Sequence, residues 1–189
     1  MSYLFLACSV ILSFVFGMSS ASKLGRSAFR DFVASAGPLK ILPRSLRPLA
    51  SRVVVSSEIA LTVVLLVGAG SAALPALVPV AVVALTAAAA LLLVFTVAIV
   101  ATLRRGGQQA CRCFGAKATP LGPAHVVRNV LLLAVALAGL VAVIATEPSV
   151  EPGGAVLAGV AGLVVGLLVT RFDDLTDLFG TPEISARGR

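Results

Sequence analysis

The stretch LVPVAVVALTAAAALLLVFTVAIVATL, residues 77–103, decides the fold of this chain. It contains no charged residue from its first leucine to its last. A helix needs about 20 consecutive apolar residues to cross the hydrocarbon core of a bilayer, so this stretch is long enough to span it. Its many alanines carry little side-chain bulk, which predicts close contacts with neighbouring helices.

Four further apolar stretches accompany it, and the composition of the whole chain is typical of a membrane protein. The sequence is 59% hydrophobic and 12% charged, with a mean hydropathy of +1.07, which excludes a water-soluble globular domain. We expect an all-α polytopic membrane protein, a bundle of about five transmembrane helices and at least four, in a domain at 1–171 with a tail at 172–189. The expected spans are residues 2–20, 53–72, 77–103, 126–145 and 154–170.

Lysine and arginine are confined to alternate connections between these spans. Seven fall in residues 21–52, five in residues 104–128 and three from Arg171 onward, which accounts for all 15 in the chain. In the cell membrane, the positive-inside rule then places the N-terminus outside, the C-terminus inside, and the loops at 21–52 and 104–125 in the cytoplasm. The net charge of +7 therefore reflects orientation in the bilayer, and we expect no nucleic-acid partner.

The first basic loop contains a pattern typical of a short amphipathic helix. Ser27 is positioned to cap it, and Phe29, Phe32 and Val33 would share one face. Such a helix is expected to lie on the membrane surface.

The loop at 104–125 carries the reactive chemistry of the chain, the sequence Cys111-Arg112-Cys113-Phe114-Gly115. Two cysteines one residue apart close a disulfide only through a tight ring, which predicts a strained, easily reduced bond suited to exchange. Arg112 between the sulfurs favours thiolate over thiol. Further cations flank the pair at Arg104, Arg105 and Lys117.

Two other interpretations of these cysteines stay open. The first is an exposed loop with no chemical role. The second is a metal site, but a closed zinc site needs four ligands and His125 is the only histidine in the chain. We therefore expect no metal.

Glu58 lies one to two turns inside the second apolar stretch, where an ionised carboxylate is costly unless it is protonated or paired. One interpretation is a proton carrier for the cysteine pair. The other is a structural role, in which Glu58 reaches the membrane interface or forms an ion pair with Arg52 or Arg128 that holds two helices together.

The fourth span opens with His125, Arg128 and Asn129. Arg128 and Asn129 can reach back toward the loop cysteines or extend to lipid headgroups, and the headgroup interpretation is favoured. His125 is interpreted as a polar boundary residue, with proton transfer near a thiolate as the alternative. Cys8, in the first span, is interpreted as a small buried hydrophobe facing another helix, with a redox role as the alternative.

Small residues recur every four positions in the fifth span and predict a face for close helix packing. They are Gly154, Ala158, Gly162 and Gly166. The partner of this face is either another helix of the chain or a second copy in a homo-oligomer.

Taken together, these residues resemble the MauE family of methylamine-utilisation membrane proteins, within a wider DoxX-like group of small helical redox membrane proteins. The resemblance covers roughly residues 1–145. The residues that carry it are Ser22-Lys23-Leu24 after the first span, Glu58-Ile59-Ala60-Leu61, the CRCFG loop and Arg128-Asn129.

The resemblance implies a membrane thiol–disulfide redox protein that supports maturation of an exported, cysteine-containing partner alongside a thioredoxin-like protein. In that function Cys111 and Cys113 are the redox pair, and Glu58 is a possible proton carrier. The supporting residues are Arg112, Phe114, Gly115, His125, Arg128 and Asn129. Electrons would have to cross the membrane, so a quinone or a partner protein is the expected acceptor. The alternative is a non-catalytic assembly subunit that holds partners through its glycine face and basic loops.

Overall fold

The computed structural model describes residues 1–35, 43–105, 110–111, 119–120, 122–145 and 150–171. In chain order the elements are α1 (Ser2–Ala21), α2 (Arg26–Ser35), α3 (Arg47–Ala69), α4 (Val78–Arg104), β1 (Ala110–Cys111), β2 (Thr119–Pro120), α5 (Pro123–Ile144) and α6 (Pro152–Thr170). Two 3₁₀ turns, Gly70–Ala72 and Pro75–Leu77, form the hairpin between α3 and α4. Five of the described helices, all except α2, are long and apolar enough to cross a membrane. The prediction of a five-helix membrane bundle is confirmed.

Three spanning helices begin earlier than the sequence predicted, and each has a proline in its first turn. The helix α3 starts at Arg47, α5 at Pro123 and α6 at Pro152, two to six residues before the expected starts. Proline suits the first helical turn because the N–H it lacks has no partner there and its φ is already helical. The basic loop at 21–52 is therefore shorter than expected, and its last part is the first turns of α3.

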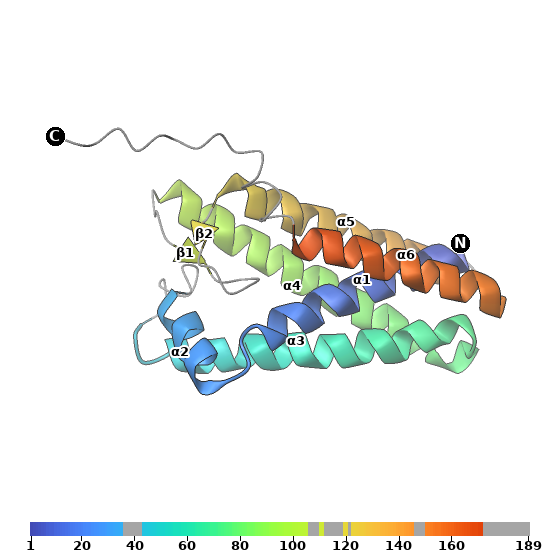
Figure 1. Ribbon diagram of the computed structural model, residues 1–189, viewed down its shortest axis with the longest axis horizontal. Helices are drawn as coiled ribbons and strands as arrows, with labels where there is room; N and C mark the ends of the chain where they lie inside the picture. Colours follow the sequence, from blue (N-terminus) through green and yellow to red (C-terminus); the bar gives the residue numbers. More distant parts are fainter. Residues whose placement is uncertain (36–42, 106–109, 112–118, 121, 146–149, 172–189) are drawn as a thin grey trace.

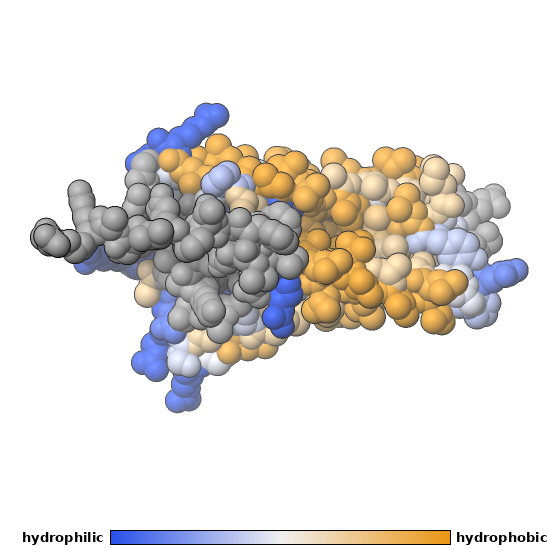
Figure 2. Space-filling view, turned by 45° about the horizontal axis from the view of Figure 1, so that its top comes forward, coloured by the Kyte–Doolittle hydropathy of each residue, from blue (hydrophilic) through white to orange (hydrophobic). Residues whose placement is uncertain are grey.

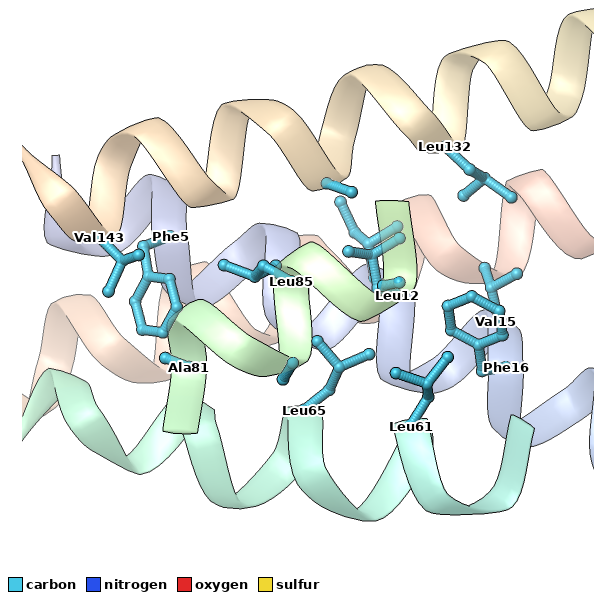
Figure 3. Close-up of a cluster of buried hydrophobic side chains, with 14 of the residues drawn as sticks. Phe5, Leu12, Val15, Phe16, Leu61, Leu65, Ala81, Leu85, Leu132 and Val143 are labelled. Atoms are coloured by element: carbon cyan, nitrogen blue, oxygen red, sulfur yellow. The ribbon is translucent and has the colours of Figure 1, made fainter. Parts of the chain in front are cut away.

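The helix α1 is the centre of the bundle. It packs against α3, α5 and α6, while α4 closes the far side by packing against α3 and α5 (Figure 1). Figure 3 shows how apolar side chains of α1 meet those of its neighbours; the core includes Phe5, Leu12, Val15 and Phe16 of α1, Leu61 and Leu65 of α3, Leu85 of α4 and Leu132 of α5. Residues of α1 therefore contact α3, α5 and α6.

The glycine face of α6 packs against α1 of the same chain. A Cβ added at Gly162 would lie 2.9 Å from the carbonyl oxygen of Ala7, and one at Gly166 would lie 3.0 Å from the Phe14 ring. The expected homo-oligomer face was Gly154, Ala158, Gly162 and Gly166. Within the chain the partner of this face is α1, and the homo-oligomer stays a prediction.

Changing Gly162 to leucine is expected to separate α6 from α1, because the new side chain would enter space held by the α1 backbone. Gly159→Leu on the same helix is the matched control, since an added Cβ there meets nothing within 4 Å. Thermal unfolding in detergent should show a clear loss of stability for Gly162→Leu and little change for the control. Equal effects of the two variants would contradict the observed packing.

All lysines and arginines in the described residues lie at one end of the bundle, which we call the basic end. It is where α1, α4 and α6 finish and where α3 and α5 begin. Figure 2 shows several strongly hydrophilic side chains projecting at this end and an apolar surface along the middle of the molecule. The alternation of basic and neutral connections predicted from the sequence is therefore present in the bundle.

The short helix α2 lies at the basic end. It starts at Arg26, one residue before the predicted cap Ser27, so Ser27 is inside the helix. The preceding Gly25 has a φ of 107°, a conformation that glycine adopts without strain. Phe32 is buried against Val55 of α3. The apolar face of α2 therefore packs on α3, and its position on the membrane surface stays a prediction.

Candidate functional site

The reactive loop leaves the bundle at the basic end through a short strand pair. In β1 and β2, Cys111 pairs with Thr119 and Ala110 with Pro120 in antiparallel register. The strand β1 also contacts α2, and Figure 1 shows both strands at the same end as α2. The main chain of Cys111 is thereby placed next to the helix that packs on α3.

Most of the predicted CRCFG site lies outside the described residues. This applies to Arg112, Cys113, Phe114 and Gly115, and to the flanking Lys117. A disulfide between Cys111 and Cys113 therefore stays a prediction. The flanking Arg104 and Arg105 are exposed at the end of α4.

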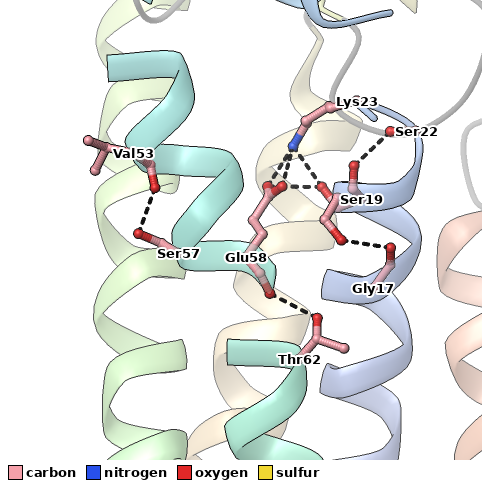
Figure 4. A network of polar contacts seen from close by, with 9 residues as sticks. Gly17, Ser19, Ser22, Lys23, Val53, Ser57, Glu58 and Thr62 are labelled. Atoms are coloured by element: carbon pink, nitrogen blue, oxygen red, sulfur yellow. Dashed lines mark hydrogen bonds and ion pairs between the residues drawn. The ribbon is translucent and has the colours of Figure 1, made fainter. Parts of the chain in front are cut away.

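Beside α2, Glu58 of α3 is the centre of a buried polar cluster (Figure 4). Its side chain is turned toward the basic end, and the residue is only 1% exposed. The Lys23 Nζ donates to both carboxylate oxygens, at 2.6 Å and 2.7 Å. The Ser19 hydroxyl donates to Oε1 of Glu58 at 2.9 Å. The carboxylate thus has the opposite charge and the hydrogen bonds that a buried charge needs.

The partner of Glu58 is Lys23, which corrects the prediction of a pair with Arg52 or Arg128. Lys23 directly follows α1 and reaches back along it, so its ammonium also donates to Ser19 Oγ at 2.8 Å. Lys23 and Glu58 are 35 residues apart in the chain, so their spacing alone does not predict this pair.

Burial lowers the pKa of Lys23 below that of a free lysine, because desolvation disfavours the charged ammonium. The charge of Glu58 and its hydrogen bond act in the opposite direction. The positive charge of Arg128 contributes further to the lowering. The ion pair with Glu58 is therefore what favours a charged Lys23 at this position.

The three polar residues that open α5 face inward at the same end. His125, Arg128 and Asn129 are all buried, with Arg128 only 2% exposed. They continue the buried face that Leu132 and Ala136 form further along α5. Arg128 and Asn129 therefore do not extend to headgroups, which corrects the favoured interpretation, and His125 is not an exposed boundary residue.

The family comparison covers most of this architecture. The model of the family described as methylamine utilisation protein MauE matches residues 1–142. The chain belongs to the MauE family. No curated protein and no solved structure matches it.

The MauE match contains every element of the candidate site. It runs from α1 through most of α5, and so includes the Lys23–Glu58 pair, the cysteine loop and Arg128. The helix α6 lies beyond the match. The MauE part of the chain therefore contains all of the polar residues described above, and α6 contributes its packing against α1.

Cys8 lies within the MauE region but away from this site. It is buried in α1 and faces α5. A Cβ added at Gly139 of α5 would lie 3.0 Å from the Cβ of Cys8. It precedes Ser19 by about three helical turns, roughly 16 Å along the axis at about 1.5 Å per residue. The interpretation of Cys8 as a small buried residue facing another helix is confirmed.

Proposed function

We propose that this MauE-family protein is a membrane thiol–disulfide exchange protein that supports the maturation of an exported, cysteine-containing partner. The observation that supports this most is the position of Cys111. Its strand rests on α2, and Phe32 of α2 covers the Lys23–Glu58 pair, with the Lys23 Nζ 4.9 Å from the ring centroid. The strand that ends at Cys111 therefore contacts the helix whose Phe32 ring lies against the Lys23 ammonium.

The reaction is an exchange in which atoms and electrons balance. A thiolate of a partner on the cytoplasmic side, either the client before its export or a thioredoxin-like protein, attacks one sulfur of a Cys111–Cys113 disulfide, forms a mixed disulfide and releases the other cysteine as a thiolate. The partner's second thiolate then attacks its own sulfur in the mixed disulfide. The partner gains a disulfide and loses two protons and two electrons, which the protein holds as a dithiol. The reverse sequence reduces the partner.

The basic end favours this chemistry because cations stabilise the thiolate, which is the attacking form. Arg104 and Arg105 precede the loop and are exposed there. Glu58 is proposed as a proton carrier for the exchange, because its carboxylate is turned toward this end.

We propose that the basic end faces the cytoplasm, following the positive-inside rule. Lasting disulfides are rare there, whereas transient catalytic ones are expected. Regeneration of the disulfide then needs an acceptor for two electrons, which we propose is a quinone or a thioredoxin-like protein. An apolar depression of about 500 Å³ beside the last turns of α4, lined by Val97, Val100, Ala101 and the two arginines, is where a membrane-soluble acceptor would approach the loop.

Trapping with single-cysteine variants tests this function. In Cys111→Ser and Cys113→Ser, loss of the resolving sulfur should make one variant accumulate a mixed disulfide with a partner, visible on non-reducing gels and identified by mass spectrometry. An impermeant maleimide should label the remaining cysteine of the pair in inverted vesicles and leave it unlabelled in intact cells, with Cys8 changed to serine in both variants so that no other thiol reacts. Absence of any adduct from both variants, with the cysteines reduced and unreactive, would refute the proposed function.

The alternative of a non-catalytic assembly subunit has less support. It holds partners through the glycine face and the basic loops, and α1 of the same chain already packs against the glycines of that face.

A further inference from the structure

The helix α4 finishes at the basic end (Figure 1), and its last turns border an apolar depression of about 500 Å³. Val97, Val100 and Ala101 line it within the apolar part of the helix. Arg104 and Arg105 line it where the helix ends. Val97 is 61% exposed, so the depression opens on the outer surface of the bundle. Its volume lies in the range of about 300–1,000 Å³ that is typical of small-molecule sites.

The depression is about as long as one half of the hydrocarbon core of a bilayer. Its lining runs from Thr96 to Arg105, which is roughly 14 Å along a helix that rises about 1.5 Å per residue. Half of a core of about 30 Å is about 15 Å. When the arginines lie at the level of the headgroups, the other end of the depression therefore lies near the middle of the bilayer, which is the course of a lipid acyl chain.

The two arginines supply positive charge at the headgroup end of the depression. Both are exposed, and neither side chain has a hydrogen bond or ion pair with a residue that the structure describes. Neighbouring residues of a helix point about 100° apart, yet both arginines line the depression, so they flank its end. The planar guanidinium binds phosphate oxygens through two parallel N–H donors. This end of the depression therefore suits a phosphate group.

We propose that the depression holds one anionic phospholipid, with its phosphate between Arg104 and Arg105 and one acyl chain along Val97, Val100 and Ala101. A zwitterionic lipid has the same chain and phosphate, but its headgroup cation is repelled by the arginines, so the site prefers a net negative lipid. This goes beyond the proposed function and does not depend on it. An electron acceptor that approaches the cysteine loop here would have to displace the lipid.

A general attraction between the basic end and anionic headgroups would also concentrate such lipids around the protein. That attraction applies equally to Arg52, which is exposed at the same end on α3 and does not line the depression. A comparison of the lipid beside α4 with the lipid beside α3 therefore separates a lipid site from general attraction.

The experiment uses a single tryptophan as a local reporter, because the chain contains none. Val94→Trp places it on α4, eleven residues before Arg105, and Val63→Trp is the matched control on α3, eleven residues after Arg52. Eleven residues are about three helical turns, so each reporter shares a face with its arginine. Both valines are exposed, at 61% and 54%. The full chain is reconstituted in phosphatidylcholine vesicles that contain brominated phosphatidylglycerol or brominated phosphatidylcholine, and bromine quenches the fluorescence of an adjacent tryptophan.

The relative binding constant at Val94→Trp should favour phosphatidylglycerol over phosphatidylcholine by about tenfold, because two arginines each attract the anionic headgroup. Adding Arg104→Gln and Arg105→Gln should abolish this preference. Val63→Trp should be quenched almost equally by the two lipids, with or without Arg52→Gln. The preference at Val94→Trp should fall as salt is added, because exposed charges are screened.

Equal preference for phosphatidylglycerol at the two reporters would overturn the proposal, since it would reduce the effect to general attraction. So would a preference at Val94→Trp that persists without the two arginines. Relief of the quenching by inorganic phosphate at constant ionic strength would mean that the arginines bind a free anion, which would also overturn it.

Discussion

Changing Cys111 and Cys113 together to serine is expected to abolish maturation of the dependent partner while leaving the bundle intact. Serine has a hydroxyl that neither forms a disulfide nor attacks one, so both halves of the exchange are lost. Both cysteines lie in the connection between α4 and α5, outside the spanning helices, so the fold should survive. The measurement is the amount of partner with native disulfides in the original host, with membrane levels of the variant quantified in parallel.

Cys8→Ser is the control for this double variant. Cys8 is buried in α1 against Gly139 of α5, away from the basic end. Its replacement therefore removes a sulfur without changing the loop. Partner maturation should persist in Cys8→Ser. Full maturation in the Cys111→Ser, Cys113→Ser double variant would exclude thiol exchange, and loss of maturation in Cys8→Ser alone would mean that the third cysteine takes part in it.

The five spans could be predicted from the sequence because a long apolar run has few alternatives in a polytopic chain. Helix starts were less predictable. The predicted spans left Pro48 and Pro123 in the preceding loops, yet each proline lies in the first turn of its helix, α3 and α5. The position of the cysteine loop at the basic end also followed from sequence, because alternate connections must lie on the same side.

Contacts between helices were the part that the sequence left open. The glycine spacing of α6 predicts a packing face, but the same spacing serves a second copy or the chain's own α1. Similarly, a carboxylate such as Glu58 indicates that a cation lies nearby, and only the fold decides which one. The buried polar face at the start of α5 was in principle visible, since His125, Arg128, Asn129 and Leu132 follow helical spacing. It was overlooked because polar residues at a span end usually face headgroups.

Replacing Glu58 with glutamine is expected to lower the free energy of unfolding by about 3–5 kcal/mol, because it leaves the Lys23 ammonium buried without its counter-charge. Lys23→Met should have a loss of similar size, since it leaves the carboxylate alone. The variant carrying both changes should lose much less than the sum, because neither charge is then buried. A double-mutant cycle measured by unfolding in mixed micelles gives the coupling energy, and strict additivity would contradict the ion pair.

The loss of stability in Glu58→Gln should also depend on pH, and the pKa of Lys23 sets the direction of that dependence. Burial and Arg128 lower the pKa of Lys23, and Glu58 opposes them, so without Glu58 the pKa in the folded state falls further. The unfolded state keeps an ordinary lysine and therefore binds more protons between the two pKa values, so the stability of Glu58→Gln rises with pH in that window.

The stability deficit of Glu58→Gln relative to the unmodified protein should be largest near neutral pH and shrink as pH rises toward about 10, the ordinary range of lysine. The doubly neutral variant lacks the titrating amine and should show no such recovery. A deficit that stays constant with pH would mean that Lys23 moves to solvent once its partner is removed, and that Glu58 alone determines its burial.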